Sequence, residues 1–545
     1  MSKIIKLGSK ARAGIKAGVD ILAAAVGASL GPKGRTAIIG KSYGAPDINN
    51  DGVTIAKAIE LEDPIEQLGA SLVQHAANKT NDVAGDGTTS TVVLTSSLVG
   101  EGIRMVESGI DPVALRRGMN LALEKSLEVL DEMHKSVESE EEMADVATIS
   151  SRSKDIGSMI AKMLQKVGKN GVVTVQSGDG NSIETELTEG MQFDKGFKSP
   201  YFVTDTQRME AVMEHPAILV TDRKISSIHE VVKLLEQLLQ SGKKDILIIA
   251  EDVDGDALAN FILNKMRGTF NILAVQAPAF GDRRKAMLQD IAVLTGATFI
   301  SSDLGMKLET ATIDDLGSCD RVISNKDTTT LVGGSGEKSA IEARIAEITN
   351  AMQSASSDYD REKFQERLAK LSGGVGVIKV GAATEVAMKE LKYLVEDALN
   401  ATKAAVAEGV VSGGGSALIK VAHQLKDLKS ENPDEHAGIQ IVLRAMQAPF
   451  RQIAQNSGIY DISILVNDIQ GSPRGGYDFL NMKMVEDMIQ AGIVDPVLVT
   501  KEAMKNAVSV AGSILTTEVA IVDKPKEEVA SAAPGMGGMG MDGMY

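Results

Sequence analysis

Between residues 217 and 302 the sequence alternates short apolar runs with segments of helical length. The runs are "AILVT", "DILIIA", "NILAVQA" and "TFISS", and the segments between them include "SIHEVVKLLEQLLQSG", "DALANFILNKMRG" and "RRKAMLQDIAVLTG". This alternation is typical of strand–helix–strand units, in which helices cover the faces of a sheet. The pattern therefore predicts an α/β module with a parallel or mixed sheet in the middle of the chain.

The segments on both sides of this module have a different texture. Helical periodicity dominates up to about residue 135 and again from about residue 409 to 520. Acidic helical segments lie between these ends and the module, "GVVTVQSG" with "SIETELTEG" alternates like a β-hairpin, and a charged helix is expected at roughly 339–371. The order is helical, mixed, α/β, mixed, helical. One economical arrangement packs the two chain ends as one domain, with the middle module inserted through a connector.

Composition narrows the class of protein. A chain of 545 residues is too long for one core, and about three or four domains are expected. The hydrophobic content of 43% is that of a folded chain, and with only 3% aromatic residues and no Trp its core must be aliphatic. A net charge of −17 argues against a nucleic-acid partner, because phosphate contacts need clustered Lys and Arg.

Sequence signals also bear on location and on the chain end. The single cysteine, Cys319, cannot form an intrachain disulfide, so nothing demands an oxidising compartment. No secretory signal and no apolar run of about 18 residues is found, so we expect no membrane contact and a cytoplasmic location. The tail "SAAPGMGGMGMDGMY" is of low complexity and is expected to be disordered.

The stretch "NDVAGDGTTST", residues 81–91, carries the strongest chemical signal. Its glycines allow closely spaced N–H groups to form an anion site, and the following residues have helical spacing, so the turn is expected to open a helix. Asp86 in this turn cannot bind phosphate itself but can hold Mg²⁺, which bridges phosphate oxygens. Asp and Thr are also ordinary helix caps, and the turn alone is explained at least as well by capping.

Other polar turns and two helices raise similar alternatives. "SLGPKG", "NNDG", "SGGGSA" and "GIVDP" are glycine- or proline-bounded turns, in which Asp51 is most simply a capping residue, and Asp397 is most simply a solvated helix residue. The helices expected at 227–240 and 256–267 carry apolar residues on more than one stripe. Such helices are either covered on both sides or expose an apolar groove that binds other polypeptides.

Taken together, long stretches of the chain resemble a known family. They are "SLGPKGR", "NDGVTIAKAIELEDP", "NDVAGDGTTST", "IIAEDVDGDALANFILNKMRG", "APAFGDRRKAMLQDIAVLTG", "GGVGVIKVGAATEVAMKELKYLVEDALNATKAAVAEGVVSGGGSAL" and the Gly-Met tail. In this order they resemble a group I chaperonin of the bacterial GroEL type over essentially the whole chain. "YDFLNMKMVEDM" departs from the family pattern.

The resemblance implies a fold and a set of partners. It implies ATP-driven folding of non-native polypeptides by a homo-oligomer of two stacked seven-membered rings, with a co-chaperonin lid of the GroES type and with ATP, Mg²⁺ and K⁺ as cofactors. The implied fold is multidomain α and α/β: a mainly helical equatorial domain (1–134 and 409–522), a small α+β intermediate domain (135–189 and 375–408), an α/β apical domain (190–374) and a disordered tail (523–545).

The resemblance also assigns site residues. Asp397 would activate the attacking water, Asp51 would position it, and Asp86 would hold Mg²⁺. ATP would be bound by Ser29, Leu30, Gly31, Pro32, Asp86, Gly87, Thr88, Thr89, Ser90, Gly414, Asp478, Phe479, Leu480 and Asp495. Polypeptides would be bound by Phe197, Tyr201, Phe202, Val232, Leu235, Leu258, Ile262 and Leu263, and domain hinges would lie near Gly190, Gly373, Gly374 and Gly409.

Two other classes of function fit parts of the sequence. An ATP-dependent transferase acting on a small molecule would also explain "GDGTT" and Asp51, but it leaves the two apolar helices unexplained. A non-catalytic scaffold could keep the architecture, although Asp51, Asp86 and Asp397 are all present.

Overall fold

The computed structural model describes residues 2–40, 46–168, 171–178, 180–206, 208–355 and 357–524, and the chain forms two compact units. Unit 1 contains residues 1–133, 414–486 and those from 499 onward, and unit 2 contains residues 134–413 and 487–498. The unit boundaries at 133 and 413 lie close to two of the predicted domain boundaries. The division of unit 2 into intermediate and apical domains stays a prediction, and residues 525–545 of the predicted tail lie outside the described residues.

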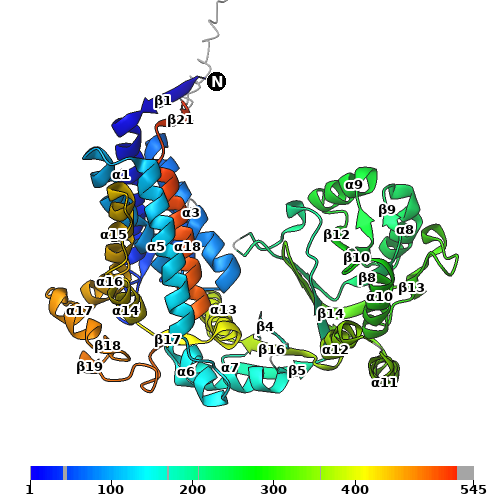
Figure 1. Ribbon diagram of the computed structural model, residues 1–545. Helices are drawn as coiled ribbons and strands as arrows, with labels where there is room; N and C mark the ends of the chain where they lie inside the picture. Colours follow the sequence, from blue (N-terminus) through cyan, green and yellow to red (C-terminus); the bar gives the residue numbers. More distant parts are fainter. Residues whose placement is uncertain are drawn as a thin grey trace, which may run out of the picture. The chain divides into compact units, whose positions relative to one another are not determined.

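Unit 1 is built mainly of long helices packed side by side (Figure 1). Its helices are α1 Gly8–Gly27, α2 Gly52–Lys57, α3 Pro64–Ala84, α4 Thr88–Glu107, α5 Pro112–Met133, α14 Ser416–Gln424, α15 Pro433–Ala445, α16 Ala448–Asn456, α17 Ile462–Gln470 and α18 Val497–Leu515. Its strands are β1 Lys3–Leu7, β2 Ala37–Ile39, β3 Asp47–Asn49, β18 Gly476–Asp478, β19 Lys483–Val485 and β21 Val519–Asp523.

Local sequence signals explain where α3 begins and ends. The Asp63 carboxylate caps the helix by accepting a hydrogen bond from Ile65 N at 2.7 Å, and Pro64 occupies the first helical position. Gly85 ends the helix in the left-handed conformation at φ 70°. This left-handed glycine turns the chain into the "GDGTT" turn, so α4 begins only a few residues after α3 ends.

Helices α1 and α3 pack with their backbones in direct contact. A Cβ atom on Gly18 would lie 1.8 Å from the carbonyl oxygen of Glu66, and a Cβ atom on Gly69 would lie 2.0 Å from that of Ile15. Only glycine permits such an approach. The two chain ends are also joined, because β1 pairs antiparallel with β21 and places Lys3 opposite Asp523.

Unit 2 contains a mixed eight-stranded sheet with the order β12-β10-β8-β14-β15-β6, to which β13 and β7 are added at β8 and β14. The strands of the sheet are β6 Gly190–Phe193, β7 Ala211–Glu214, β8 Ala217–Thr221, β10 Asp245–Ala250, β12 Asn271–Gln276, β13 Phe299–Ile300, β14 Gly317–Ser324 and β15 Thr329–Gly334. Around it lie α8 Val232–Gln240, α9 Gly255–Met266, α10 Gly281–Thr295, β9 Lys224–Ile225, β11 Asp252–Val253, η1 Pro200–Phe202, η2 Ile228–Glu230, η3 Leu308–Thr310 and η4 Ile313–Asp315.

The predicted α/β module is confirmed. Strands β8, β10 and β12 are parallel neighbours, and the helices between them in sequence are α8 and α9. These strands are nearly continuous apolar runs because both faces of the sheet are covered. Cys319 lies buried in β14, and burial raises the pKa of its thiol to about 12, so this thiol is not poised as a nucleophile.

The remaining elements of unit 2 are α6 Glu140–Ser151, α7 Lys154–Val167, β4 Val172–Ser177, β5 Ile183–Thr188, α11 Lys338–Ser354, α12 Asp358–Ser372, β16 Val375–Val380, α13 Glu385–Glu408, β17 Val410–Ser412 and β20 Val494–Pro496. They include a three-stranded sheet of β4, β16 and β5 and a separate pair of strands, β17 and β20, whereas α11 and α12 pack with α10 beside the large sheet. The predicted β-hairpin is wrong, because β16 lies between β4 and β5, parallel to the first and antiparallel to the second. The nearly all-buried strand β16 needs neighbours on both edges, and a direct β4–β5 pair would leave it outside the sheet.

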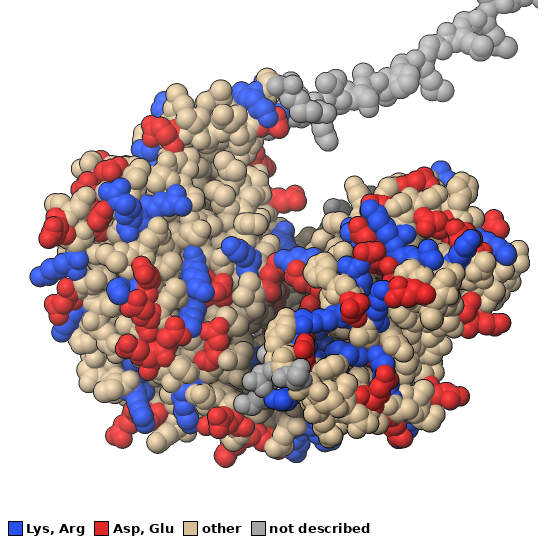
Figure 2. Space-filling model, turned by 45° about the vertical axis from the view of Figure 1, so that its right-hand side comes forward, with Lys and Arg blue, Asp and Glu red and all other residues tan. Residues whose placement is uncertain are grey.

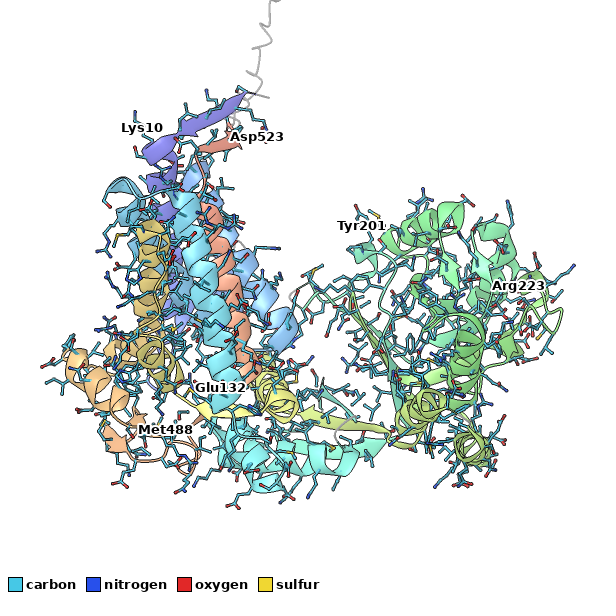
Figure 3. The ribbon with its side chains drawn as sticks, in the orientation of Figure 1. Lys10, Glu132, Tyr201, Arg223, Met488 and Asp523 are labelled. Atoms are coloured by element: carbon cyan, nitrogen blue, oxygen red, sulfur yellow. The ribbon has the colours of Figure 1, made fainter. Side chains whose placement is uncertain are left out.

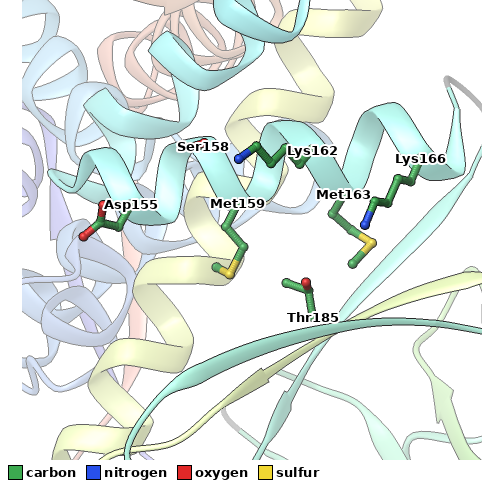
Figure 4. A pocket seen from close by; sticks show the side chains of 7 residues that line it. All are labelled: Asp155, Ser158, Met159, Lys162, Met163, Lys166 and Thr185. Atoms are coloured by element: carbon green, nitrogen blue, oxygen red, sulfur yellow. The ribbon is translucent and has the colours of Figure 1, made fainter.

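Helix α7 faces one side of this small sheet. Figure 4 shows Met159 and Met163 pointing from α7 towards Thr185 of β5, with Lys162 and Lys166 beside them. The hollow between helix and strand has a volume of about 330 Å³. Its flexible methionine side chains are suited to filling an irregular gap of this kind.

The predicted single charged helix at 339–371 is two helices, α11 and α12. The chain leaves α11 at Ala355, whose ψ of 127° is extended, and Ser357 caps α12. Both helices are joined to α10 through Asp290, whose side chain is 1% exposed. Arg344 Nε of α11 and Arg367 Nε of α12 donate to its two oxygens at 2.7 and 2.8 Å.

The surface carries charged side chains of both signs (Figure 2). On the face drawn in Figure 2, acidic and basic side chains are interspersed. Among the described residues, no helix has the length and apolar character that crossing a membrane requires.

Asp290→Asn tests the buried ion-pair network. Removing the charge leaves two guanidinium groups without their buried counterion, and this should lower the free energy of unfolding by roughly 3–5 kcal/mol. Guanidinium chloride titration followed by circular dichroism measures the change. Asp360→Asn, which removes an exposed partner 3.8 Å from Arg283, is the control and should change stability by less than about 1 kcal/mol. Equal effects of the two variants would contradict the assigned role of Asp290.

Candidate functional site

The turns "NNDG" and "GDGTT" meet in unit 1 although Gly52 and Asp86 lie 34 positions apart in the sequence. Helices α2 and α4 contact each other, and a Cβ atom built on Gly52 would lie 2.2 Å from Oγ1 of Thr89. A side chain at position 52 would force the Thr89 side chain to move, so glycine there lets the start of α2 lie directly against the start of α4. Periodicity and turn signals gave no reason to pair these two turns, and only the family resemblance placed both at one site.

The start of α4 is shaped to receive an anion. Gly87 precedes the helix at φ 87°, and a Cβ atom there would lie 2.7 Å from a side-chain carbon of Val499, so only glycine fits. No side chain caps α4 in the described structure, whereas Asp63 caps α3. The first N–H groups of α4, those of Thr88, Thr89 and Ser90, therefore remain available to a ligand at the positive end of the helix dipole.

Asp51 is a helix cap in this structure. One of its carboxylate oxygens accepts from Val53 N at 3.1 Å, and the other accepts from Thr54 N at 2.9 Å and Thr54 Oγ1 at 2.7 Å. Asn49 Oδ1 accepts from the Asp51 N–H at 2.8 Å and fixes the turn further. The capping interpretation of Asp51 is thus confirmed, and its part in positioning water stays a prediction.

Asp86 is electrostatically strained. Burial among neighbouring groups raises the pKa of the Asp86 carboxyl, and the negative charge of Asp51 raises it further. A hydrogen bond that the carboxylate accepts from Gly87 N at 2.6 Å opposes this rise. The residue nevertheless keeps a solvent-exposed surface. Two carboxylates that repel each other beside an exposed face are the arrangement that a bound cation would relieve.

The donor set fits Mg²⁺ better than a transition metal. Within the described residues, no group of three or more His, Cys, Asp and Glu side chains is placed to hold a metal. Mg²⁺ commonly uses one or two carboxylates together with water and phosphate oxygens rather than an all-protein cage. Asp86, with Asp51 near it and the uncapped start of α4 beside it, offers that environment.

A second group of predicted residues lies around an aliphatic and aromatic cluster of unit 1. Leu30 and Phe479 both pack in this cluster with Phe450 and Ile453, and a Cβ atom on Gly414 would lie 3.9 Å from the ring of Phe479. Gly27 at the end of α1 lies close to Val93 of α4, so this region adjoins the start of α4. The structure therefore brings Leu30 and Gly31 to the cluster, and it places the end of α1, which leads into this turn, beside α4.

Asp478 and Phe479, which were predicted to contact adenine, also hold the local structure together. The Asp478 carboxylate accepts from Leu480 N at 2.9 Å and from Asn481 N at 3.0 Å, and these and other bonds to Asn481 lower its pKa against the effect of burial. Phe479 is 3% exposed and packs edge-on against Phe450, with the two ring centroids 5.0 Å apart. Leu480 is 64% exposed, so among the three it is the side chain free to meet a ligand at the surface.

Two residues near this region were missed by sequence reasoning. Asn456 Nδ2 donates to the carbonyl oxygens of Gly27 and Leu30 at 2.9 and 2.8 Å and so fixes the "SLGP" turn. Ser416, the first residue of α14, is fully buried, and its hydroxyl has no hydrogen-bond partner among the described residues. The quoted turn "SGGGSA" was the available signal for Ser416, whereas nothing in the sequence pointed to Asn456.

Asp397 and Asp495 belong to unit 2. Asp397 lies in α13, and Asp495 lies in β20, where it stands opposite Val411 of β17. Helix α13 packs against β20, so the two aspartates share one region of that unit. Their predicted roles at the nucleotide stay predictions.

The predicted polypeptide-binding residues divide by exposure. Phe202 is fully buried and Leu235 is 6% exposed, so both are core residues in this structure, and Phe197, Val232, Leu258 and Ile262 are half-buried. Tyr201 and Leu263 are 66% and 42% exposed, and Figure 3 shows Tyr201 close to α9. Met266 of α9 and Leu239 of α8, which belong to the apolar stripes but not to the residues assigned by the resemblance, are also exposed.

Asp86→Asn tests the electrostatic strain at the turn. Because the folded-state pKa of Asp86 is raised, ionising it costs stability at every pH above its unfolded pKa. In metal-free buffer at pH 7 the variant should therefore unfold about 2 °C higher than the wild type, and the gain should vanish as the pH falls towards 3. Differential scanning calorimetry with EDTA measures this. Glu62→Gln, which removes an exposed charge of unit 1, should show no such gain.

The sequence matches a known protein family over nearly its whole length. The model of the TCP-1/cpn60 chaperonin family matches residues 22–525, which is nearly the whole chain. Chaperonins assist protein folding, act on unfolded polypeptides as oligomeric rings, and include known ATPases. The match spans the polar turns of unit 1 as well as the α/β module and α13 of unit 2. The chain belongs to the TCP-1/cpn60 chaperonin family.

Proposed function

We propose that this chain is an ATP-driven folding chaperone of the bacterial GroEL type. The observation that carries the proposal is the meeting of "SLGP", "NNDG" and "GDGTT" around the uncapped start of α4. Residues widely separated in sequence meet there, and they offer N–H donors, carboxylates and an adjoining apolar cluster. This is the set of groups that phosphates, a divalent cation and a nucleoside require.

Each part of the site has a role in this proposal. The N–H groups of Thr88, Thr89 and Ser90 bind the phosphates, and Asp86 holds Mg²⁺, which supplies charge stabilisation at the transferring phosphoryl group. Asp51 orients water from the rigid capped turn at the start of α2. The nucleoside is held between the "SLGP" turn, Gly414 and the region of residues 478–480, with Asp495 contributing from unit 2.

Asp397 completes the reaction as the general base. A base must come within hydrogen-bond reach of the attacking water in the reactive state, and in-line phosphoryl transfer depends mainly on positioning and charge. In this proposal hydrolysis depends on Asp397, which belongs to the same unit as the α/β module. ATP turnover is thereby linked to the state of the unit that carries the apolar helices α8 and α9.

The apolar side chains of unit 2 supply broad client binding. Tyr201, Leu263 and Met266 expose apolar surface, and burial of such surface is worth about 25 cal/mol per Å² whatever the client sequence. In this proposal a co-chaperonin lid of the GroES type displaces the client into the cavity of a double seven-membered ring. K⁺ is included as a cofactor through the family resemblance.

Asp397→Asn should separate binding from hydrolysis. Loss of the base should lower the turnover number for ATP about a hundredfold or more while ATP binding stays within about threefold of the wild type. Steady-state phosphate release and equilibrium nucleotide binding, measured in parallel, give the two quantities. Glu390→Gln, an exposed charge on the same helix, should hydrolyse ATP normally. Normal turnover in Asp397→Asn would show that another group activates the water.

Leu263→Ser tests the apolar client surface. Replacing this exposed apolar side chain of α9 should weaken capture of a denatured, aggregation-prone protein about tenfold, because part of the buried apolar area is lost. Suppression of light scattering by aggregating client measures capture. Leu187→Ser changes a 54% exposed leucine on the small sheet and is the matched control. If both variants capture the client as well as the wild type, α9 is not the client surface.

A further inference from the structure

Arg208 links two parts of unit 2 that the fold otherwise builds separately. It lies in the turn between η1 and β7, and its guanidinium forms an ion pair with the carboxylate of Glu396 on α13. The same guanidinium lies 4.6 Å from the ring centroid of Tyr393, one helical turn earlier on α13. The side chains of Arg208 and Glu396 are only 21% and 13% exposed, so this pair is largely shielded from solvent and salt.

The turn that carries Arg208 is closely held. Thr204 N and Asp205 N both donate to the carbonyl oxygen of Glu210 at 2.9 Å, and Glu210 N donates back to Asp205 O at 3.1 Å. Asp205 Oδ1 accepts from Arg208 N at 3.2 Å. These bonds hold the backbone of Arg208 in place, so a movement of its side chain is coupled to a movement of the turn.

This turn is continuous with the surface proposed to bind clients. Directly before it lies η1, with the exposed Tyr201, and η1 packs against α9, where Lys265 Nζ donates to the carbonyl oxygen of Phe202. Directly after it lies β7, which pairs with β14 in the large sheet. Arg208 is thus joined through short covalent and hydrogen-bonded paths to both α9 and the sheet.

The other end of the link reaches the proposed base. Glu396 is the residue before Asp397 on α13, and the negative charge of Asp397 contributes to raising the pKa of Arg208, after that of Glu396 and against the effect of burial. The guanidinium therefore interacts with both neighbouring carboxylates.

We propose that Arg208 is a positioning residue that couples ATP hydrolysis to client handling, by fastening the helix of Asp397 to the η1–β7 turn and hence to α9. The proposal rests on the proposed function for the roles of Asp397 and α9. While the Arg208–Glu396 pair is closed, α13 and the large sheet move as one body. When it is broken, Asp397 can reach its reactive position without moving the client surface.

The pair is sensitive to pH in a defined direction. Burial raises the pKa of Glu396 to about 7, against the opposing charges of Arg208 and Lys392. The link is therefore complete above pH 7 and weakens as the pH falls below 7 and Glu396 takes up a proton. The charged and titratable groups facing Glu396 are Lys392, Tyr393 and Lys403 on α13, Asp205, Arg208 and Glu210 on the turn, and Arg321 on β14.

The first measurement is independent of ATP. Amide hydrogen exchange of the nucleotide-free full chain, followed by mass spectrometry, should show roughly three- to tenfold faster exchange in the η1–β7 turn and in α13 for Arg208→Gln and for Glu396→Gln. The double variant should exchange no faster than either single variant, because one shared interaction is lost. Glu186→Gln, which breaks an exposed 2.8 Å pair with Lys379 in the small sheet, should leave both segments unchanged.

The second measurement tests coupling. The amount of client refolded per ATP hydrolysed should fall about threefold or more in Arg208→Gln, with Arg208→Lys intermediate because it keeps the charge but loses the planar stacking. The same ratio should fall in the wild type between pH 8 and pH 6, and this pH dependence should be absent from Glu396→Gln.

Three outcomes would overturn the proposal. They are exchange in the two segments that matches the wild type in both single variants, additive effects in the double variant, and a refolding ratio that is unchanged in Arg208→Gln. A wild type that hydrolyses no ATP would instead contradict the proposed function, and the exchange experiment would still decide whether the link exists.

Discussion

The close packing of α1 against α3 is the constraint on which the site in unit 1 depends. Glycines at 18 and 69 let the two backbones touch, and side chains at either position would force the helices apart. The ends of α1 and α3 lead into "SLGP" and "GDGTT", so the distance between these turns is set by the spacing of the two helices. Gly52 and Gly87 then set how closely α2 and Val499 approach the start of α4. The position of the "GDGTT" turn is thus a consequence of helix packing.

Unit 1 concentrates unfavourable electrostatics where a ligand would relieve it. Helix α4 lacks a side-chain cap, and Asp86 ionises against both burial and the charge of Asp51. Each feature costs stability in the absence of a ligand, and each is favourable once phosphate and a cation are bound. Local features that lower stability in the absence of a ligand are typical of binding sites. The neighbouring helix α3, by contrast, is capped at both ends.

Unit 2 uses polar contacts to hold its layers together. Asp290 joins three helices through two arginines, and Arg208 joins α13 to the turn before β7. The two differ in consequence. Asp290 is almost completely buried within one module, so its network fixes a static core, whereas the Arg208–Glu396 pair lies between elements that could separate. Because this pair is largely shielded from solvent, breaking it is costly unless both charges regain water as the elements separate.

The sequence by itself determined the α/β module, the helical chain ends and the polar turns, because periodicity and glycine, proline and capping signals act over a few residues. It also carried the family, through motifs in order along the chain. It could not determine that β16 separates β4 from β5, that the helix expected at 339–371 breaks at Ala355, or that Asn456 and Ser416 adjoin the site. Those features depend on contacts between residues far apart in sequence, which only the tertiary structure brings together.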